Sequence, residues 1–470
     1  MPSYTRQLAE FAFNLRLTDV PDNVITRAKW LILDGLSCGL YGSDVKWTNI
    51  LAGVIKRLEP EGGQATIWGR DESASAINAA LVNGTMVQGY ELDDGHQSES
   101  FHSCAAVLPA AFAAAEFVGA DKVDGGKLLL GIIAGFEIGP RVSACMNGPQ
   151  MVSNGWHGPA IIASFPAAIA AGIVLGLNST QYFHALGIAG TQACGLMAAQ
   201  FGSMVKRMQC AKNAQSGVYA ALLAADDFTG IEDIFEQNYG GFCSTFSHSA
   251  DQFNLPALLD GLGERWETMR AGIKIYACMG GNHCAVNAIE ELMNETGLKA
   301  EDVDEITVGL TEAAVKHGGW WPYVPKGLTG AQMHIGYCIA MQLIEGAVFV
   351  DQMVEDNVAR PDLVELANRV RAVRSVEREQ KKDYDFRPSR GADVMVKLKN
   401  GKILKRTVDF RPGSDRRPLT EMQMTTKYRR LASKVLSEAK VTEMEKAVWE
   451  LERAPSVTRL INVLKLESSH

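Results

Sequence analysis

Apolar residues recur at helical spacing through most of the first 225 positions of the chain. Apolar side chains three and four positions apart form one face of a helix, so this pattern predicts a series of packed helices. The predicted helices cover residues 4–15, 23–40, 73–87, 180–198 and 213–225, with three apolar helices between 104 and 177. A short extended segment is expected at 62–71.

The pattern changes after residue 228. Residues 228–265 are rich in turn-forming and aromatic residues, and residues 305–310 then alternate like a strand. Residues 393–410 predict a hairpin that turns at Asn400-Gly401. Further helices are expected at 282–296, 332–346, 361–378 and, as polar amphipathic helices, from 411 to 466.

Together these patterns predict a mainly α fold with two structural parts. Residues 1–266 and 411–470 are expected to form a large all-helical domain. Residues 267–410 are expected to form a smaller α+β domain that is inserted into the helical one.

The composition of the 470 residues, 47% hydrophobic and 21% charged, describes a soluble globular protein. A net charge of −8 argues against nucleic-acid binding by bulk charge, although a local cationic pocket can still form.

Nine singly scattered cysteines are typical of reduced thiols in a cytoplasmic protein, and Arg6 and Glu10 interrupt any secretory signal. The apolar run 160–177 contains Ser164 and Pro166 and lacks basic flanks, so we expect a buried core helix and no membrane span.

Residues 90–103 concentrate ionisable groups between two apolar segments that are predicted to be buried helices. The loop holds Glu91, Asp93, Asp94, His96, Glu99 and His102. A polar loop at a helix terminus has free backbone N–H groups that can hold an anion. Alternatively, Asp93 and Asp94 are ordinary turn and N-cap residues, which are common roles of Asp.

Two other segments carry candidate residues. His157 stands among glycines and a proline at the expected start of an apolar helix, where the macrodipole favours a neutral imidazole or a bound anion. An ordinary polar cap is the simpler reading of His157. Lys206 and Arg207 fall between two apolar helices with Gly, Met, Ala and Cys as neighbours, so we expect them to be partly enclosed. Enclosed cations need an anionic partner, such as a substrate carboxylate.

The chain lacks the glycine-rich nucleotide motifs, the Gly-x-Ser-x-Gly motif of serine hydrolases and the His-Glu-x-x-His motif of zinc proteases. The spacing of Cys278, His283 and Cys284 fits no common zinc pattern, so we expect no metal. The remaining acids, imidazoles and cations suit proton transfer next to a carboxylate.

Several motifs together resemble the MmgE/PrpD family, which includes 2-methylcitrate dehydratase, cis-aconitate decarboxylase and iminodisuccinate epimerase. The motifs are Glu91-Leu92-Asp93-Asp94-Gly95-His96 followed by His102-Ser103, Gly155-Trp156-His157, Gly202 to Arg207, Ala214 to Ala220 and Phe228-Thr229-Gly230. The resemblance spans almost the whole chain. It implies a helical domain built from both ends of the chain, an α+β lid, an active site between them, a homodimer and no organic cofactor.

The resemblance also implies which residues surround the pocket. They are Asp93, Asp94, His102, His157, Lys206 and Lys274. We predict additional substrate contacts from Glu91, His96, Arg207, Met279, His283 and Tyr323.

The chain departs from the decarboxylase branch of that family at several positions. Glu91 to Gly95 replace Asp-Phe-Asp-Asp-Thr, which removes a Thr hydroxyl, and the loop to His102 is one residue longer. Met279 occupies the lid position of a catalytic His, and the active-site Tyr of that branch falls within residues 317–323. These departures argue against decarboxylation of cis-aconitate.

Our hypothesis from the sequence is a lyase that dehydrates a citrate-like polycarboxylate such as 2-methylcitrate. Lys206, Arg207 and Lys274 would bind carboxylates and stabilise the developing enediolate. One of His102 and His157 would abstract the proton, and the other His or a loop acid would protonate the departing hydroxyl. Decarboxylation or epimerisation through the same carbanion, and binding of a polycarboxylate without catalysis, remain alternatives.

Overall fold

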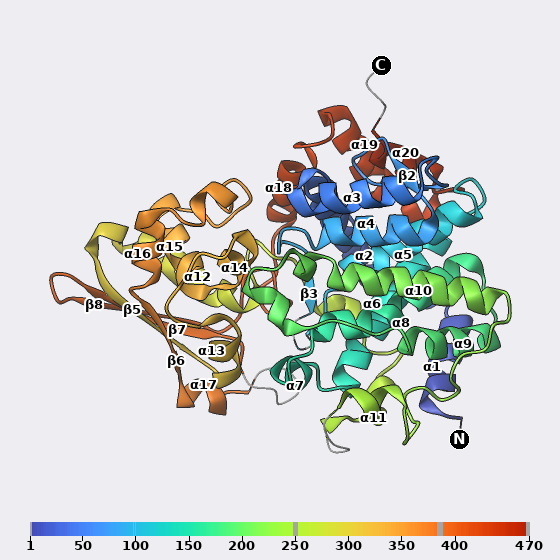
Figure 1. The fold of residues 1–470 in the computed structure, drawn as a ribbon, viewed down its shortest axis with the longest axis horizontal. Coiled ribbons are helices and arrows are strands. Elements are labelled where there is room, and N and C mark those ends of the chain that lie inside the picture. Colours follow the sequence, from blue (N-terminus) through green and yellow to red (C-terminus); the bar gives the residue numbers. More distant parts are fainter. Residues whose placement is uncertain (1, 97, 99, 248–251, 383–388, 467–470) are drawn as a thin grey trace.

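The computed structural model describes residues 2–96, 98, 100–247, 252–382 and 389–466 and is mainly helical, as predicted (Figure 1). The helices up to residue 225 are α1 (Tyr4–Asn14), α2 (Asp22–Tyr41), α3 (Lys46–Leu58), α4 (Ala76–Val87), α5 (Cys104–Val118), α6 (Gly125–Cys145), α7 (Gly148–Ser153), α8 (Gly158–Leu175), α9 (Ser179–Gly190) and α10 (Gln209–Ala225). The expected extended segment is reduced to β1 (Ala65–Thr66), which pairs with β2 (Ser73–Ala74).

One predicted helix, at 180–198, is shorter than expected. Helix α9 ends at Gly190, and the chain then turns through Gly195, which has a φ of 145°. Leu196 pairs with Trp156, and the Gln209 side chain accepts a hydrogen bond from the Leu196 backbone N–H. These long-range contacts satisfy backbone groups that a continued helix would have used.

Helix α8 lies at the centre of the helical part and packs against α5, α6 and α10. Small side chains permit this close packing: a Cβ atom at Gly217 of α10 would lie only 2.5 Å from the Ala167 Cβ of α8. Helices α6 and α8 are long and apolar enough to cross a membrane, but 89% and 94% of their apolar windows are buried inside the protein. The predicted buried core helix at 160–177 is therefore confirmed. All nine cysteines are free thiols, and eight are buried.

A four-stranded sheet organises the second part of the chain (left in Figure 1). Its order is β6-β5-β7-β8, with β5 (Val303–Leu310) parallel to β6 (Val370–Arg374) and antiparallel to β7 (Ala392–Leu398). The predicted hairpin is confirmed, because β7 pairs with β8 (Ile403–Val408) across Asn400 and Gly401. This part also contains α12 (His283–Thr296), α13 (Glu312–Gly318), α14 (Leu328–Met333) and α15 (Ile335–Glu345). Its buried apolar residues form a hydrophobic cluster separate from that of the helical part.

The predicted helix at 361–378 is wrong. The segment forms α16 (Pro361–Ala367), then β6, then α17 (Val376–Gln380). The strand lies at the edge of the sheet, where Val370 is buried and Arg374 is exposed. Its backbone bonds to β5 outweigh the helical propensity of a charged sequence.

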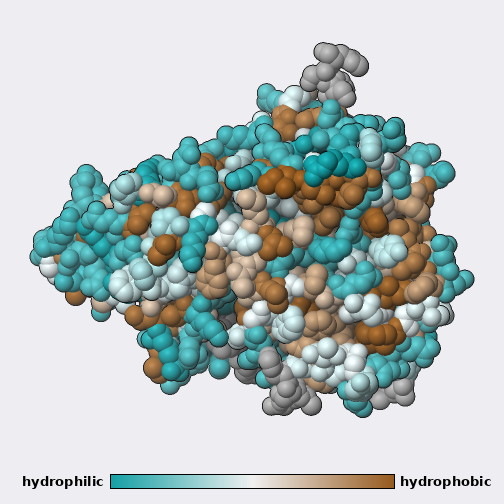
Figure 2. All heavy atoms as spheres, in the orientation of Figure 1, coloured by the Kyte–Doolittle hydropathy of each residue, from teal (hydrophilic) through white to brown (hydrophobic). Residues whose placement is uncertain are grey.

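The last helices return to the first part of the chain. They are α18 (Glu421–Ala432), α19 (Glu438–Trp449) and α20 (Thr458–Leu464), and α18 and α19 pack against α2. Figure 1 shows these red helices beside the blue N-terminal ones. Figure 2 shows an apolar patch over α3, where Ile50 and Leu58 are 54% and 69% exposed.

Candidate active site

The acidic loop predicted from the sequence is held in place by segments that are far from it along the chain. Its strand β3 (Gly95–His96) pairs with β4 (Ala271–Gly272), at the junction between the helical and α+β parts. Lys427 of α18 donates to the Leu92 carbonyl oxygen at 2.7 Å, and Arg411 donates to the Gly95 carbonyl oxygen at 2.7 Å. The loop is therefore fixed where the two parts meet.

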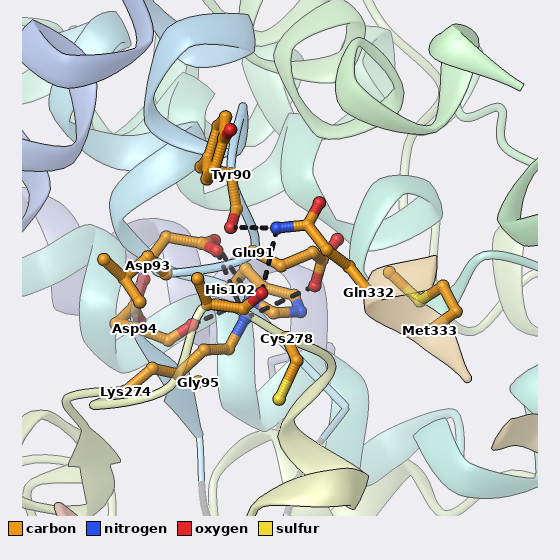
Figure 3. A network of polar contacts seen from close by, with 12 residues as sticks. Tyr90, Glu91, Asp93, Asp94, Gly95, His102, Lys274, Cys278, Gln332 and Met333 are labelled. Atoms are coloured by element: carbon orange, nitrogen blue, oxygen red, sulfur yellow. Dashed lines mark hydrogen bonds and ion pairs between the residues drawn. The ribbon is translucent and has the colours of Figure 1, made fainter. Parts of the chain in front are cut away.

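Glu91 is the centre of the site (Figure 3). One of its carboxylate oxygens lies 3.0 Å from Lys206 Nζ and 2.7 Å from Arg207 Nη1, and the other lies 3.5 Å from Lys274 Nζ. All four side chains are buried. Burial alone raises the pKa of Glu91, but Lys206, Lys274 and Arg207 together hold it well below its usual range. The predicted enclosure of Lys206 and Arg207 is confirmed, and Glu91 provides the anionic partner.

The backbone of Glu91 is unusual because its φ is 54°, in the left-handed region. This conformation costs a non-glycine residue about 1–3 kcal/mol and persists only where surrounding contacts impose it. A strained residue at the centre of a charged cluster is typical of functional sites.

His102 and Asp93 form a pair beside this cluster. The Nδ1 atom of His102 lies 3.0 Å from Asp93 Oδ2 and 2.7 Å from the Asp94 carbonyl oxygen. A carbonyl oxygen only accepts, so Nδ1 carries the proton and Nε2 is the atom left to exchange a proton with a ligand. Lys274 Nζ lies 3.2 Å from the other Asp93 oxygen. Burial alone raises the pKa of Asp93, but Lys274 and His102 lower it to about 2, so this carboxylate is ionised near neutral pH.

The side chains of Asp94 and His96, which were predicted to line the pocket, contact other groups. The Asp94 carboxylate accepts hydrogen bonds from the backbone N–H groups of Ser103 and Cys104, both at 2.9 Å, at the start of α5. This is the alternative capping role considered for Asp94. His96 Nε2 lies 3.1 Å from Glu267, which belongs to a second buried cluster. The structure therefore does not bring the side chains of Asp94 and His96 into the group around Glu91.

Two imidazoles lie within the electrostatic field of Lys206. His157 is buried at the N-terminal end of α8, as predicted, and burial and the Lys206 charge hold its pKa well below the usual range. His317 of α13, which the sequence did not single out, has a pKa lowered to about 4 by desolvation and then by Lys206. Both imidazoles are neutral near pH 7, so they can donate and accept hydrogen bonds without adding charge.

The remaining predicted contacts lie in the α+β part. His283 is buried with Nε2 at 3.3 Å from the Cys278 carbonyl oxygen, and burial and the charge of Arg411 lower its pKa well below the usual range. The Met279 side chain is directed at Gly318, next to His317: a Cβ atom at Gly318 would lie 2.5 Å from its methyl group.

Tyr323 lies in the hydrophobic core of the α+β part. Its hydroxyl donates to the Val358 carbonyl oxygen at 3.0 Å, and its ring packs against His334 and Tyr337. The structure does not bring this side chain to Glu91, because its hydroxyl is directed into the core.

Sequence reasoning missed two residues that support Glu91. Gln332 of α14 donates through Nε2 to the carbonyl oxygen of Tyr90 at 2.9 Å (Figure 3). It also donates to the carbonyl oxygen of Ala277 at 2.9 Å and accepts from Arg207 Nη2 at 2.5 Å. Lys427 pairs with Asp34 at 2.5 Å in addition to its bond to the loop. Neither residue has a local signal, since a glutamine or a lysine in a helix is usually solvated.

The arrangement is suited to binding an anionic ligand and transferring a proton. Three buried cations, Lys206, Arg207 and Lys274, face two carboxylates, Glu91 and Asp93, so this group of five carries a net positive charge. An anionic group would complement this charge. His102 is 18% exposed beside this group, which allows it to reach a ligand.

Comparisons with known proteins cover nearly the whole chain. The MmgE/PrpD N-terminal domain model matches residues 6–254, and the MmgE/PrpD C-terminal domain model matches residues 276–452. A cis-aconitate decarboxylase-like protein of Aspergillus oryzae is 36% identical over 98% of this chain and 97% of its own length. Cis-aconitate decarboxylases of Aspergillus terreus and Homo sapiens are 34% and 26% identical, over 98% and 99% of this chain and 95% of each relative.

Proposed function

Because this chain belongs to the MmgE/PrpD family, we propose that it is a lyase that decarboxylates an unsaturated tricarboxylate of the cis-aconitate type. The observation that carries the proposal is the convergence of Lys206, Arg207 and Lys274 on Glu91 beside the His102–Asp93 pair. Relatives named cis-aconitate decarboxylase support this choice over dehydration.

The expectation against decarboxylation carries less weight than the comparisons. It depended on Gly95 in place of Thr and on Met279 in place of a catalytic His. Relatives named cis-aconitate decarboxylase are nevertheless 34–36% identical over 98% of the chain. Differences at a few positions are therefore weaker evidence than similarity along the entire chain. Dehydration of 2-methylcitrate remains the alternative that the experiment below tests.

In the proposed reaction, Lys206 and Lys274 bind substrate carboxylates. The carbon–carbon bond to one carboxylate breaks, carbon dioxide leaves, and the electron pair is delocalised into a conjugated carboxylate that the cations stabilise. The His102 imidazolium then donates its Nε2 proton to carbon, while Asp93 stabilises the charged ring. One carboxylate is lost as carbon dioxide and one proton is taken up, so the charges balance.

We further propose that residues 267–410 act as a lid over the helical part. Lys274 comes from this segment, whereas Lys206 and Arg207 come from the helical part, and all three contact Glu91. Opening the lid would separate these cations and admit substrate. Thus closure would complete the site around the ligand.

We also propose a homodimer, as the family resemblance implied. The apolar side chains of Ile50, Val54 and Leu58 are 54%, 36% and 69% exposed along α3, a surface that a second copy would cover (Figure 2). Light scattering of the purified protein and of Ile50→Lys would test this state.

The test of function is to incubate the purified protein with cis-aconitate or with 2-methylcitrate and to follow both by proton NMR and carbon dioxide release. We expect equal amounts of carbon dioxide and a five-carbon unsaturated dicarboxylate from cis-aconitate. Loss of water from 2-methylcitrate without carbon dioxide release would instead support a hydro-lyase. Binding of both acids without turnover would support a non-catalytic binder. Lys206→Ala provides the control, because it removes one of the proposed carboxylate ligands.

A further inference from the structure

Two side chains hold the carbonyl oxygens of the residues before and after Glu91. Gln332 Nε2 donates to the carbonyl oxygen of Tyr90, the preceding residue, at 2.9 Å. Lys427 Nζ donates to the carbonyl oxygen of Leu92, the following residue, at 2.7 Å. Glu91 lies between these two fixed carbonyls with its φ of 54°. The peptide group before Glu91 is therefore held directly, and the chain after it is held one peptide group further on.

Each of the two side chains is itself fixed by a second contact. Gln332 is fully buried, and its amide also bonds to the Ala277 carbonyl oxygen at 2.9 Å and to Arg207 at 2.5 Å. Lys427 is 6% exposed and pairs with Asp34 of α2 at 2.5 Å. Rotation of either side chain would leave a buried polar group without its partner, which is unfavourable.

The position of the Glu91 carboxylate depends on this backbone. A return of Glu91 to negative φ would rotate its side chain away from Lys206, Arg207 and Lys274, which approach it from different segments. We propose that Gln332 and Lys427 are positioning residues that hold the backbone of Glu91 in the left-handed conformation and so direct its carboxylate at the three cations. The consequence for turnover rests on the proposed function, but the consequence for anion binding does not.

The variants that test the inference are Gln332→Met and the double variant Lys427→Met/Asp34→Asn. Methionine keeps a similar length without a hydrogen bond, and Asp34→Asn avoids a buried unpaired carboxylate, which could prevent folding. The matched controls are Gln342→Met and Lys29→Met. Gln342 is a buried glutamine of α15 that donates to the Gly346 carbonyl oxygen. Lys29 is a buried lysine that donates to the Trp449 carbonyl oxygen and pairs with Glu452.

Binding is measured by calorimetry with tricarballylate, a saturated tricarboxylate, between pH 5 and 8. We expect each test variant to bind about tenfold or more weakly than the wild type, and each control to bind like it. We also expect the acid limb of the binding profile to move to higher pH in the test variants, since Glu91 would be held less closely to the cations that lower its pKa. If Gln332 and Lys427 only stabilised the fold, the acid limb of the binding profile would not shift along the pH axis.

Turnover of cis-aconitate gives the second readout. Displacement by about 1 Å of a group that positions substrate can lower kcat about 100-fold, and we expect a loss of this order in the test variants alone. If folded test variants match their controls in affinity, acid limb and kcat, the inference is wrong. A different outcome would separate the inference from the proposed function. The wild type would bind tricarballylate without turning over cis-aconitate, and the test variants would bind it weakly with a shifted acid limb. The positioning role would then stand, and the proposed function would fail.

Discussion

Two histidines of the acidic loop each pair with a carboxylate at almost the same distance, but in very different surroundings. His102 Nδ1 lies 3.0 Å from Asp93, and His96 Nε2 lies 3.1 Å from Glu267. The His102 side chain is 18% exposed, whereas the His96 side chain is fully buried. Asp93 also contacts Lys274 of the Glu91 group, whereas Glu267 lies beside Arg265, at 3.0 Å, and Arg270, at 3.6 Å.

The distance within the pair is therefore not what separates the proposed catalytic histidine from the buried one. The two differ in exposure and in the charge of their surroundings. In the proposed function, His102 presents Nε2 to a substrate, while His96 Nε2 contacts Glu267, which also lies near Arg141 of α6. Burial alone raises the pKa of Glu267, but its contacts with His96 and Arg141 lower it overall, so its carboxylate also stays ionised.

The largest expected effect compares the two histidines directly. His102→Gln should lower kcat about 10³-fold, because it removes the proposed proton donor. His96→Gln should leave kcat within about fivefold of the wild type and instead lower the free energy of unfolding. Steady-state kinetics with cis-aconitate and urea denaturation measure the two quantities. Similar losses of kcat in both variants would remove the distinction between the pairs.

A smaller effect is expected when Glu267, the carboxylate of the buried His96–Glu267 pair, is replaced. Glu267→Gln should lower the free energy of unfolding by about 3 kcal/mol, since it removes one of the two buried carboxylates beside Arg141, the other being Glu137. Glu452→Gln is the control, because Glu452 is 26% exposed in its pair with Lys29 and should contribute about 1 kcal/mol or less. Urea denaturation at pH 7 measures both values. A Glu267→Gln variant as stable as the control would show that this cluster does not hold the loop.

The smallest expected effect concerns Asp93, the carboxylate paired with His102, and the pH dependence of its contribution to stability. The pKa of Asp93 in the folded protein is about 2, below the value of about 3.9 expected in an unfolded chain. Its contribution to stability, about 2–3 kcal/mol, is therefore fully present above about pH 4 and is lost as the pH falls toward 2. Wild type and Asp93→Asn should differ by this amount at pH 5–7 and converge at lower pH in urea denaturation. A difference that grows on acidification would contradict this assignment.

The sequence was most informative where the determinants are local. Helical periodicity predicted α8 and its neighbours, and the Asn-Gly turn predicted the β7–β8 hairpin. The edge strand β6 was missed because alternating charges on an exposed edge look like those of a surface helix. Pairing with β5, more than 60 residues away, decides its conformation.

The candidate site was predictable only in part, for a related reason. The crowding of acids in one loop indicated Glu91 and Asp93, and the apolar neighbours of Lys206 and Arg207 indicated enclosed cations. Asp94 and His96 share that loop, but their side chains point to α5 and to Glu267, which no local pattern shows. Gln332 and Lys427 could not be found, since their importance comes from carbonyl oxygens 242 and 335 positions away.

The bond between Lys427 and the Leu92 carbonyl also has a consequence for biosynthesis. A ribosome adds about 5–20 residues per second, so roughly 17–67 seconds separate the synthesis of these two residues. During that interval the acidic loop is complete, but the lysine that holds its carbonyl oxygen does not yet exist. A nascent chain that ends before residue 427 cannot form this contact, so the final geometry of the loop is reached only late in synthesis.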